Sequence, residues 1–373
     1  MNPLTVHLST PPVPPVQLLT PSGERVTDPD YAFEGDRADI ESLYRDLVMT
    51  RRLDTEAYAL QRHGELGLWP PALGQEAAQV GSARAMRAQD FAFPTYRDHG
   101  VAWCRGVDPT WLLGIFRGSW LGGWDPAEHR IALPNIIIGA QTLHATGYGM
   151  GLVLEGLVGT GDAERDGAVV AYFGDGATSQ GDVSEALDWA AVYQAPVVFF
   201  CENNQYAIAV PIERQTRVPI AQRADGFGLP GVRVDGNDVL ACHAVTQRAL
   251  QRARDGQGPT LIEAVTYRMG AHTTSDDPTR YREASEVEAW QAKDPVERVR
   301  VLLESEGSSP EFFAGLSAEA DALGARLREA CRGIPEPDLA ELFDQVFAEP
   351  TVENRQQKAE YVAWRAAIEG SVA

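Results

Sequence analysis

Short apolar runs alternate with helical spacing through the middle of the chain. Residues 168–173 (AVVAYF) and 196–201 (PVVFFC) are apolar throughout, and residues 179–194 between them carry apolar side chains at helical spacing. Further elements are predicted as strands over 232–234 and 260–267, with a helix over about 239–254 between them. Strands without polar alternation that are joined by helices indicate a parallel sheet covered on both faces. The pattern therefore predicts an α/β fold.

Different patterns flank this centre. Residues 1–38 are rich in proline and lack sustained helical periodicity, which predicts an extended arm, either disordered or laid across a partner. Helical spacing begins at Asp39, and another helix is predicted over 75–86. After about Gly270 a polar stretch leads into amphipathic helices, the last near 353–368. The predicted division is an arm (1–38), an α/β domain (39–270), and a histidine-bearing loop with C-terminal helices (271–373).

Composition narrows the possible partners. With 32 basic and 53 acidic side chains, the 373 residues carry a formal charge of -21. Such a charge repels nucleic acid backbones and anionic membrane surfaces, so neither is expected as a partner. A small anionic ligand is still compatible, because helix N-termini and placed arginines create local positive sites.

Cysteine usage and hydropathy bear on the compartment. The four cysteines are far apart, with no CxxC pair and no zinc-like His/Cys spacing. No apolar run reaches the roughly 18 to 20 residues of a membrane span, and the N-terminus lacks signal-peptide character. We expect a cytoplasmic protein with reduced thiols.

Two polar motifs follow the two central strands. Gly174-Asp175-Gly176 comes after the first strand, and Asn203-Asn204-Gln205-Tyr206 comes after the second. Parallel strands joined by one helix end at the same sheet edge, where open α/β sheets bind ligands. Asp175 and Asn204 offer hard oxygen donors suited to Mg²⁺, and the glycines admit a diphosphate. Either motif alone would be interpreted as a turn or loop, but the two together favour a binding site for Mg²⁺ and a diphosphate.

A nucleotide-binding oxidoreductase is a weaker alternative. The glycines at 147, 149 and 151 do not form GxGxxG, and they lie in a helix-like stretch where small residues permit close packing. No glycine fingerprint follows a predicted strand.

The pair of motifs resembles the thiamin diphosphate motif, which opens with GDG and closes with NN, as in residues 174–204 here. Three more segments, FPTYRDHG (93–100), IIIGAQ (136–141) and YRMGAHTTSDDPTRYR (267–282), resemble the α subunit of the first component of branched-chain 2-oxo acid and pyruvate dehydrogenases. The resemblance covers most of the chain from Asp39 onward. It implies the thiamin diphosphate-binding fold.

The resemblance assigns roles to individual residues. It implies that Mg²⁺ is held by Asp175, Asn204 and the backbone carbonyl of Tyr206. It implies that thiamin diphosphate contacts Tyr96, Arg97, Ile136, Ile138, Gly174, Asp175, Gly176, Ala177, Asn204, Tyr206 and His272. His272 would lie near the reactive ring and assist acyl transfer as a proton shuttle.

Three positions depart from the family pattern. Asn135 and Ala140 stand where relatives use serine and threonine oxygens for a potassium ion, although Gln141 matches. Thr273 occupies the position of the regulated serine, so the resemblance does not carry kinase control over to this chain.

The implied activity is oxidative decarboxylation of a 2-oxo acid and reductive acylation of a lipoyl group on an acyltransferase. A partner β subunit would supply the glutamate that activates the cofactor, in an α2β2 tetramer. Branched-chain substrates are favoured, with pyruvate and acetoin dehydrogenases as alternatives. A noncatalytic assembly protein is a further alternative, disfavoured because Asp175, Asn204 and His272 are all intact.

Overall fold

One sheet of five parallel strands forms the centre of the molecule. The computed structural model describes residues 14–119 and 123–369. The strand order is β1-β2-β3-β7-β6, and all four pairings are parallel. A separate antiparallel hairpin is formed by β4 and β5. The strands are β1 (Phe91–Phe93), β2 (Val169–Gly174), β3 (Val197–Asn203), β4 (Tyr206–Ala207), β5 (Val210–Pro211), β6 (Gly231–Asp235) and β7 (Thr260–Val265).

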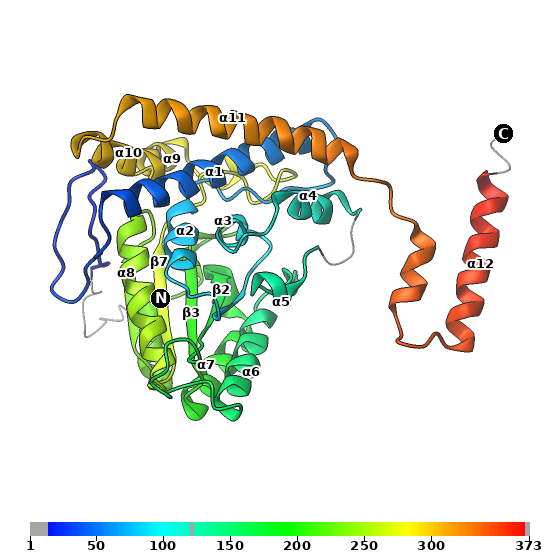
Figure 1. Ribbon diagram of the computed structural model, residues 1–373, viewed down its shortest axis with the longest axis horizontal. Coiled ribbons are helices and arrows are strands. Elements are labelled where there is room, and N and C mark those ends of the chain that lie inside the picture. Colours follow the sequence, from blue (N-terminus) through cyan, green and yellow to red (C-terminus); the bar gives the residue numbers. More distant parts are fainter. Residues whose placement is uncertain (1–13, 120–122, 370–373) are drawn as a thin grey trace, which may run out of the picture.

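Helices surround this sheet (Figure 1). The α-helices are α1 (Arg37–Arg62), α2 (Glu76–Arg84), α3 (His99–Cys104), α4 (Pro109–Arg117), α5 (Pro126–His129), α6 (Ala140–Leu154), α7 (Gly181–Tyr193), α8 (Val239–Arg254), α9 (Ala284–Gln291), α10 (Pro295–Ser305), α11 (Pro310–Gly333) and α12 (Val352–Glu369). Short 3₁₀ helices are η1 (Asp175–Ser179), η2 (Ile212–Arg214), η3 (Ile220–Phe227), η4 (Pro278–Arg280) and η5 (Leu339–Gln345).

The two faces of the sheet are buried in two separate apolar clusters. Val170 and Tyr172 of β2 point to the cluster that contains side chains of α2 and α8, with α1, α10 and α11 beyond them. Val169 and Phe173 of the same strand point to the cluster that contains side chains of α6 and α7. Burial on both faces explains why the strands lack polar alternation. The predicted α/β fold with helices on both faces is confirmed.

Most predicted elements are present. The helix predicted over 239–254 is α8 with the same bounds, and the four predicted strands are β2, β3, β6 and β7, with ends shifted by one or two residues. Asp238 begins α8, where its carboxylate accepts from the backbone N–H groups of Leu240 and Ala241. The strand β1 was not predicted, because three residues are too few to show a period.

The described part of the N-terminal arm packs against the chain itself. Val16 pairs in parallel with Val234 at the outer edge of β6. The backbone N–H groups of Leu18 and Leu19 both donate to the carboxylate of Asp238, each at 2.6 Å. Residues 14–36 are therefore ordered against the chain itself, which contradicts the expectation of disorder. The physical reason is that this segment covers a strand edge that would otherwise be open.

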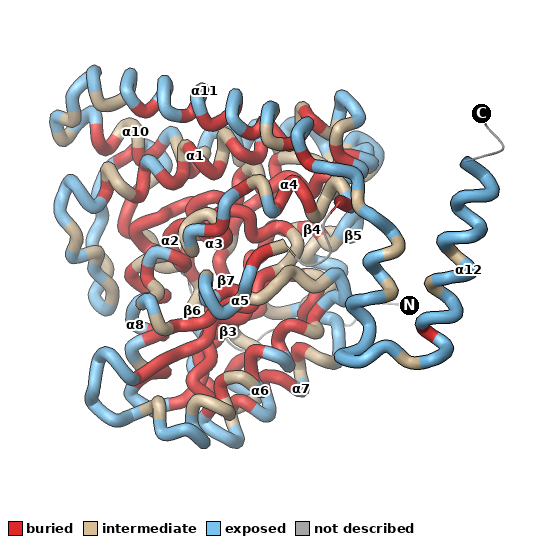
Figure 2. The backbone as a smooth tube through the Cα atoms, turned by 45° about the vertical axis from the view of Figure 1, so that its right-hand side comes forward, coloured by how far each residue is buried: buried red, intermediate tan, exposed pale blue. Residues whose placement is uncertain are grey.

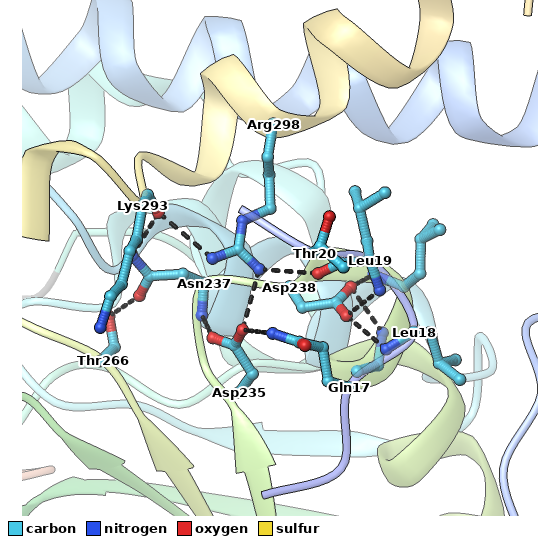
Figure 3. A network of polar contacts seen from close by, with 12 residues as sticks. Gln17, Leu18, Leu19, Thr20, Asp235, Asn237, Asp238, Thr266, Lys293 and Arg298 are labelled. Carbon is cyan, nitrogen blue, oxygen red and sulfur yellow. Dashed lines mark hydrogen bonds and ion pairs between the residues drawn. The ribbon is translucent and has the colours of Figure 1, made fainter. Parts of the chain in front are cut away.

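A buried polar network fixes this segment to α10 (Figure 3). Gln17 and Arg298 both donate to the carboxylate of Asp235, at 2.8 and 2.9 Å. Arg298 also donates to the carbonyl of Leu19. Residues 1–13, with Pro11 and Pro12 of the predicted arm, lie outside the described residues.

The C-terminal elements η5 and α12 stand away from the body (Figures 1 and 2). Most of α12 is exposed, including the large side chains Val362 and Trp364. None of the helices in the described ranges is long and apolar enough to cross a membrane.

Candidate active site

The site begins where β2 and β3 end. The two strands pair in parallel, and Gly174 lies opposite Glu202. Asp175 and Asn204 are therefore neighbours at the carboxyl edge of the sheet, where open α/β sheets bind ligands. A Cβ on Gly176 would lie 2.7 Å from the Cβ of Ala207, so glycine is required for this close approach.

Three oxygen atoms gather at this edge. With its amide oxygen facing the site, Asn204 Oδ1 lies 3.1 Å from the carbonyl oxygen of Tyr206 and 3.3 Å from Asp175 Oδ1. Asn204 Nδ2 then donates to Gln75 Oε1 at 2.9 Å, and Oδ1 accepts a long bond from Tyr206 N at 3.3 Å. The opposite amide orientation would turn Nδ2 toward both oxygens instead. The first orientation creates a set of carboxylate, amide and carbonyl oxygens that fits a hard cation such as Mg²⁺.

Asp175 is the carboxylate of this set. Its Oδ2 accepts from Gln215 Nε2 at 2.6 Å, and burial raises the pKa of the carboxyl group to about 6. Within the described ranges, no three His, Cys, Asp or Glu side chains form a metal-binding group. A cation here would therefore depend on the amide and carbonyl oxygens as well as on Asp175.

A cavity of about 530 Å³ opens at the same edge. All eleven residues indicated by the sequence line it: Tyr96, Arg97, Ile136, Ile138, Gly174, Asp175, Gly176, Ala177, Asn204, Tyr206 and His272. Gly174 is the last residue of β2. The other ten lie in the segments that follow β1, β2, β3 and β7 and in the segment that precedes α6. The tertiary structure thus brings together every predicted residue from five separate segments.

Two buried arginines give the cavity a positive character. Arg97 donates to the carbonyls of Pro71 (2.6 Å) and His272 (2.9 Å). Arg268 donates to the carbonyls of Tyr206 (3.1 Å) and Ile208 (2.7 Å). Neither guanidinium pairs with a carboxylate of the described residues, although Arg97 is only 5% exposed and Arg268 only 1%. Buried cations without acidic partners suit an anionic ligand such as a diphosphate.

His272 contacts both arginines. Its Nδ1 lies 3.2 Å from Arg97 Nη2 and 3.5 Å from Arg268 Nη1. Burial, followed by the charges of Arg97 and Arg268, lowers the pKa of His272 to about 4. The imidazole is therefore neutral at neutral pH.

Polar contacts fix the loop that carries His272. The backbone N–H of His272 donates to Asp276 at 2.8 Å, and the Tyr281 hydroxyl donates to the same carboxylate at 2.5 Å. Arg268 donates in turn to the Tyr281 hydroxyl at 3.0 Å. Arg282 donates to the carbonyls of Met269 and Gly270. The loop is thus held against the end of β7 with its histidine toward the cavity.

A buried pair of acids also lines the cavity. Burial, followed by the neighbouring carboxylate of Asp98, raises the pKa of Glu202 well above its ordinary value. Burial likewise raises the pKa of Asp98. Glu202 Oε2 accepts from Gln79 Nε2 at 3.2 Å. Burial and the nearby carboxylate of Asp98 therefore favour the protonated form of Glu202.

Several site residues were missed by the sequence reasoning. Gln75, Glu202, Arg268 and Ile208 also line the cavity. Arg268 lies within the family-like segment 267–282 and Glu202 directly before the NN pair, so both stood beside recognised motifs. No local pattern distinguishes Gln75, which simply precedes α2.

Comparison with known proteins places this chain in one protein family. The family described as "Dehydrogenase E1 component" matches residues 44–312. The 3-methyl-2-oxobutanoate dehydrogenase subunit alpha of Mycobacterium tuberculosis is 47% identical over 339 residues, covering 90% of each chain. Pyruvate dehydrogenase E1 component subunit alpha is 39% identical over 295 residues in Bacillus cereus and 40% over 297 residues in Staphylococcus aureus. Each of these two matches covers 78% of this chain and 77% of the relative.

Proposed function

Because this chain belongs to the dehydrogenase E1 component family, we propose that it is the α subunit of a branched-chain 2-oxo acid dehydrogenase. Its reaction is the thiamin diphosphate-dependent oxidative decarboxylation of a 2-oxo acid, with transfer of the acyl group to a lipoyl group. One observation carries the proposal. A single cavity brings together a set of oxygen donors for a cation, two arginines without carboxylate partners among the described residues, and a neutral histidine.

The relatives and the cavity lining support a branched-chain substrate. The relative named for 3-methyl-2-oxobutanoate is more similar, over a larger share of the chain, than the two relatives named for pyruvate. Leu68, Phe116 and Ile208 add apolar surface to the cavity, which suits a branched alkyl group. Pyruvate is the second candidate, supported by the relatives from Bacillus cereus and Staphylococcus aureus.

The residues present fit thiamin diphosphate and Mg²⁺. Asp175, Asn204 and the Tyr206 carbonyl would hold the cation, since they offer three hard oxygens at one edge. The diphosphate would be bound by Gly174, Gly176, Ala177, Tyr96 and Arg97. The backbone at Ile136 and Ile138 would hold the aminopyrimidine ring. When bound, the cofactor supplies the electron sink for decarboxylation.

This chain contributes residues that position the ligand and a histidine that can move a proton. Arg97 and Arg268 have no carboxylate partner among the described residues, so they would pair with the negative charge of the ligand. His272 keeps a proton on Nε2, because Nδ1 accepts from Arg97. We assign His272 as the group that moves a proton during acyl transfer to the lipoyl group.

A β subunit would complete the cavity. Ile136, Ile137 and Ile208, at or beside the cavity lining, are 72%, 66% and 56% exposed. Helices α6 and α7 also carry exposed apolar side chains: Leu143, Val153, Leu154, Trp189, Val192 and Tyr193. Such a surface favours a protein partner. We propose an α2β2 tetramer that also receives the lipoyl domain of an acyltransferase.

Calorimetric titration of thiamin diphosphate with Mg²⁺ tests the assignment. The chain is titrated alone and after assembly with its β subunit, and decarboxylation of 3-methyl-2-oxobutanoate and pyruvate is then compared. We expect tight binding and turnover only in the assembly, with preference for the branched substrate. Preference for pyruvate would select the second candidate, and absence of binding in the assembly would refute the proposal.

A further inference from the structure

Gln75 connects the start of α2 to the candidate cation site. Its side chain is fully buried and lines the cavity. Its Oε1 accepts from Asn204 Nδ2 at 2.9 Å, and its Nε2 has no partner among the described residues. In this orientation of the two amides, the oxygen end of Gln75 faces Asn204.

The backbone that carries Gln75 is rigidly held. Gly74 has a φ of +96°, and a Cβ there would lie 2.3 Å from the carbonyl oxygen of Tyr267. Thr266 Oγ1 lies 2.7 Å from both the Gly74 carbonyl and Asn237 Oδ1. Figure 3 shows Asn237 and Thr266 in the network that also contains Asp235 and Arg298. The backbone directly before Gln75 is thus anchored to the residues that follow β7.

The Asn204 amide has two competing orientations. In one, Oδ1 faces Asp175 and the Tyr206 carbonyl; in the other, Nδ2 donates to both, at 3.3 and 3.1 Å. The second orientation satisfies hydrogen bonds but presents an N–H group to the place of the cation. Only an acceptor on the far side of the amide favours the first orientation.

We propose that Gln75 is that acceptor, and that it is a positioning residue which holds the Asn204 oxygen toward the cation. This inference rests on the proposed function, because it concerns the Mg²⁺ site assigned there. Groups that orient metal ligands typically change metal affinity by about 10 to 100-fold when they are removed.

The test is the affinity of the assembled protein, with thiamin diphosphate, for Mn²⁺ as a spin probe of the Mg²⁺ site. Free Mn²⁺ is measured by electron paramagnetic resonance during titration, so the readout does not depend on turnover. Gln75→Leu removes the acceptor, and we expect affinity to fall by about 10-fold or more. Gln75→Glu can only accept, so it should retain wild-type affinity or exceed it.

Two further variants separate the inference from the proposed function. Gln89→Leu removes an amide outside the cavity lining, one that donates to the carbonyls of Ala163 (2.7 Å) and Asp166 (3.0 Å) and should leave Mn²⁺ affinity unchanged. Asp175→Ala should abolish Mn²⁺ binding. If Gln75→Leu keeps wild-type Mn²⁺ affinity while Asp175→Ala loses it, the role of Gln75 is overturned but the cation site stands. Equal losses of Mn²⁺ affinity in Gln75→Leu and Gln75→Glu would also overturn the role of Gln75. Unchanged affinity in Asp175→Ala would overturn the cation site itself.

Discussion

The guanidinium of Arg97 donates through Nη2 to Nδ1 of His272 across 3.2 Å. A guanidinium has no acceptor, so this contact assigns the imidazole proton to Nε2. Positive charge beside the ring also disfavours a second proton, which agrees with the lowered pKa of His272. Arg97 thereby fixes the tautomer of His272 and adds to the effect of burial, which keeps the imidazole neutral.

Arg97→Gln should raise the pKa of His272 from about 4 toward the ordinary value, because it removes the nearer positive charge. Histidine carbon and nitrogen chemical shifts, followed from pH 3 to 8, report this pKa. Arg280→Gln, an exposed position on the same loop, serves as the control. An unchanged pKa in Arg97→Gln would exclude Arg97 as a cause.

Asp175→Ala should abolish Mg²⁺-dependent binding of thiamin diphosphate, since it removes the carboxylate from the oxygen set. Calorimetry with and without Mg²⁺ measures the effect. Asp188→Ala, an exposed carboxylate on α7, should bind normally. Equal cofactor affinity in the two variants would contradict the metal assignment.

His272→Ala should slow acyl transfer to lipoamide by about 10²–10⁴-fold, the usual contribution of a positioned acid or base. Cofactor affinity should change much less, because Arg97 and Arg268 are retained. Single-turnover acylation of a lipoyl domain is compared with calorimetric binding. Equal losses in both measurements would place His272 in another role.

Glu202→Gln should remove part of the pH dependence of stability. The folded-state pKa of Glu202 is raised, so its stabilising contribution is complete below the ordinary pKa of glutamate, about 4.3, and declines as pH rises toward the folded-state value. The variant cannot lose this proton and should gain stability relative to wild type as pH increases. Thermal unfolding from pH 5 to 8 measures the difference, and parallel curves for the two proteins would refute the raised pKa.

Gly74→Ala should destabilise the fold by more than the roughly 1–2 kcal/mol cost of a left-handed alanine, because its Cβ would also clash with the Tyr267 carbonyl. Gly64→Ala is the matched control, since Gly64 has a φ of +82° and no atom within 4 Å of its would-be Cβ. Urea unfolding of both variants measures the free energies. Similar losses would show that backbone strain, without the clash, accounts for the effect.

Local patterns were sufficient for the centre of the fold. The apolar runs at 168–173 and 196–201 became β2 and β3 because strands buried on both faces need apolar side chains at every position. The parallel order then placed Asp175 beside Asn204, as their positions after these strands predicted. The resemblance to a known family added Tyr96, Arg97, Ile136, Ile138 and His272, all of which reach the same cavity.

Only the tertiary structure decided how these groups interact. Gln75 meets Asn204 across 129 positions, and Arg97 meets His272 across 175, so no local period reveals either contact. Likewise, the N-terminal segment covers β6 because Asp238 binds its backbone more than two hundred positions away. The sequence by itself determined the central elements, the positions of Asp175 and Asn204 and the sheet edge at which these two residues meet, since these depend on spacing along single strands and their ends. The tertiary structure decided the surroundings of the Asn204 amide, the tautomer of His272 and the burial of Arg97 and Arg268 away from carboxylates. These features depend on distant segments that pack together, so they emerged only from the folded chain.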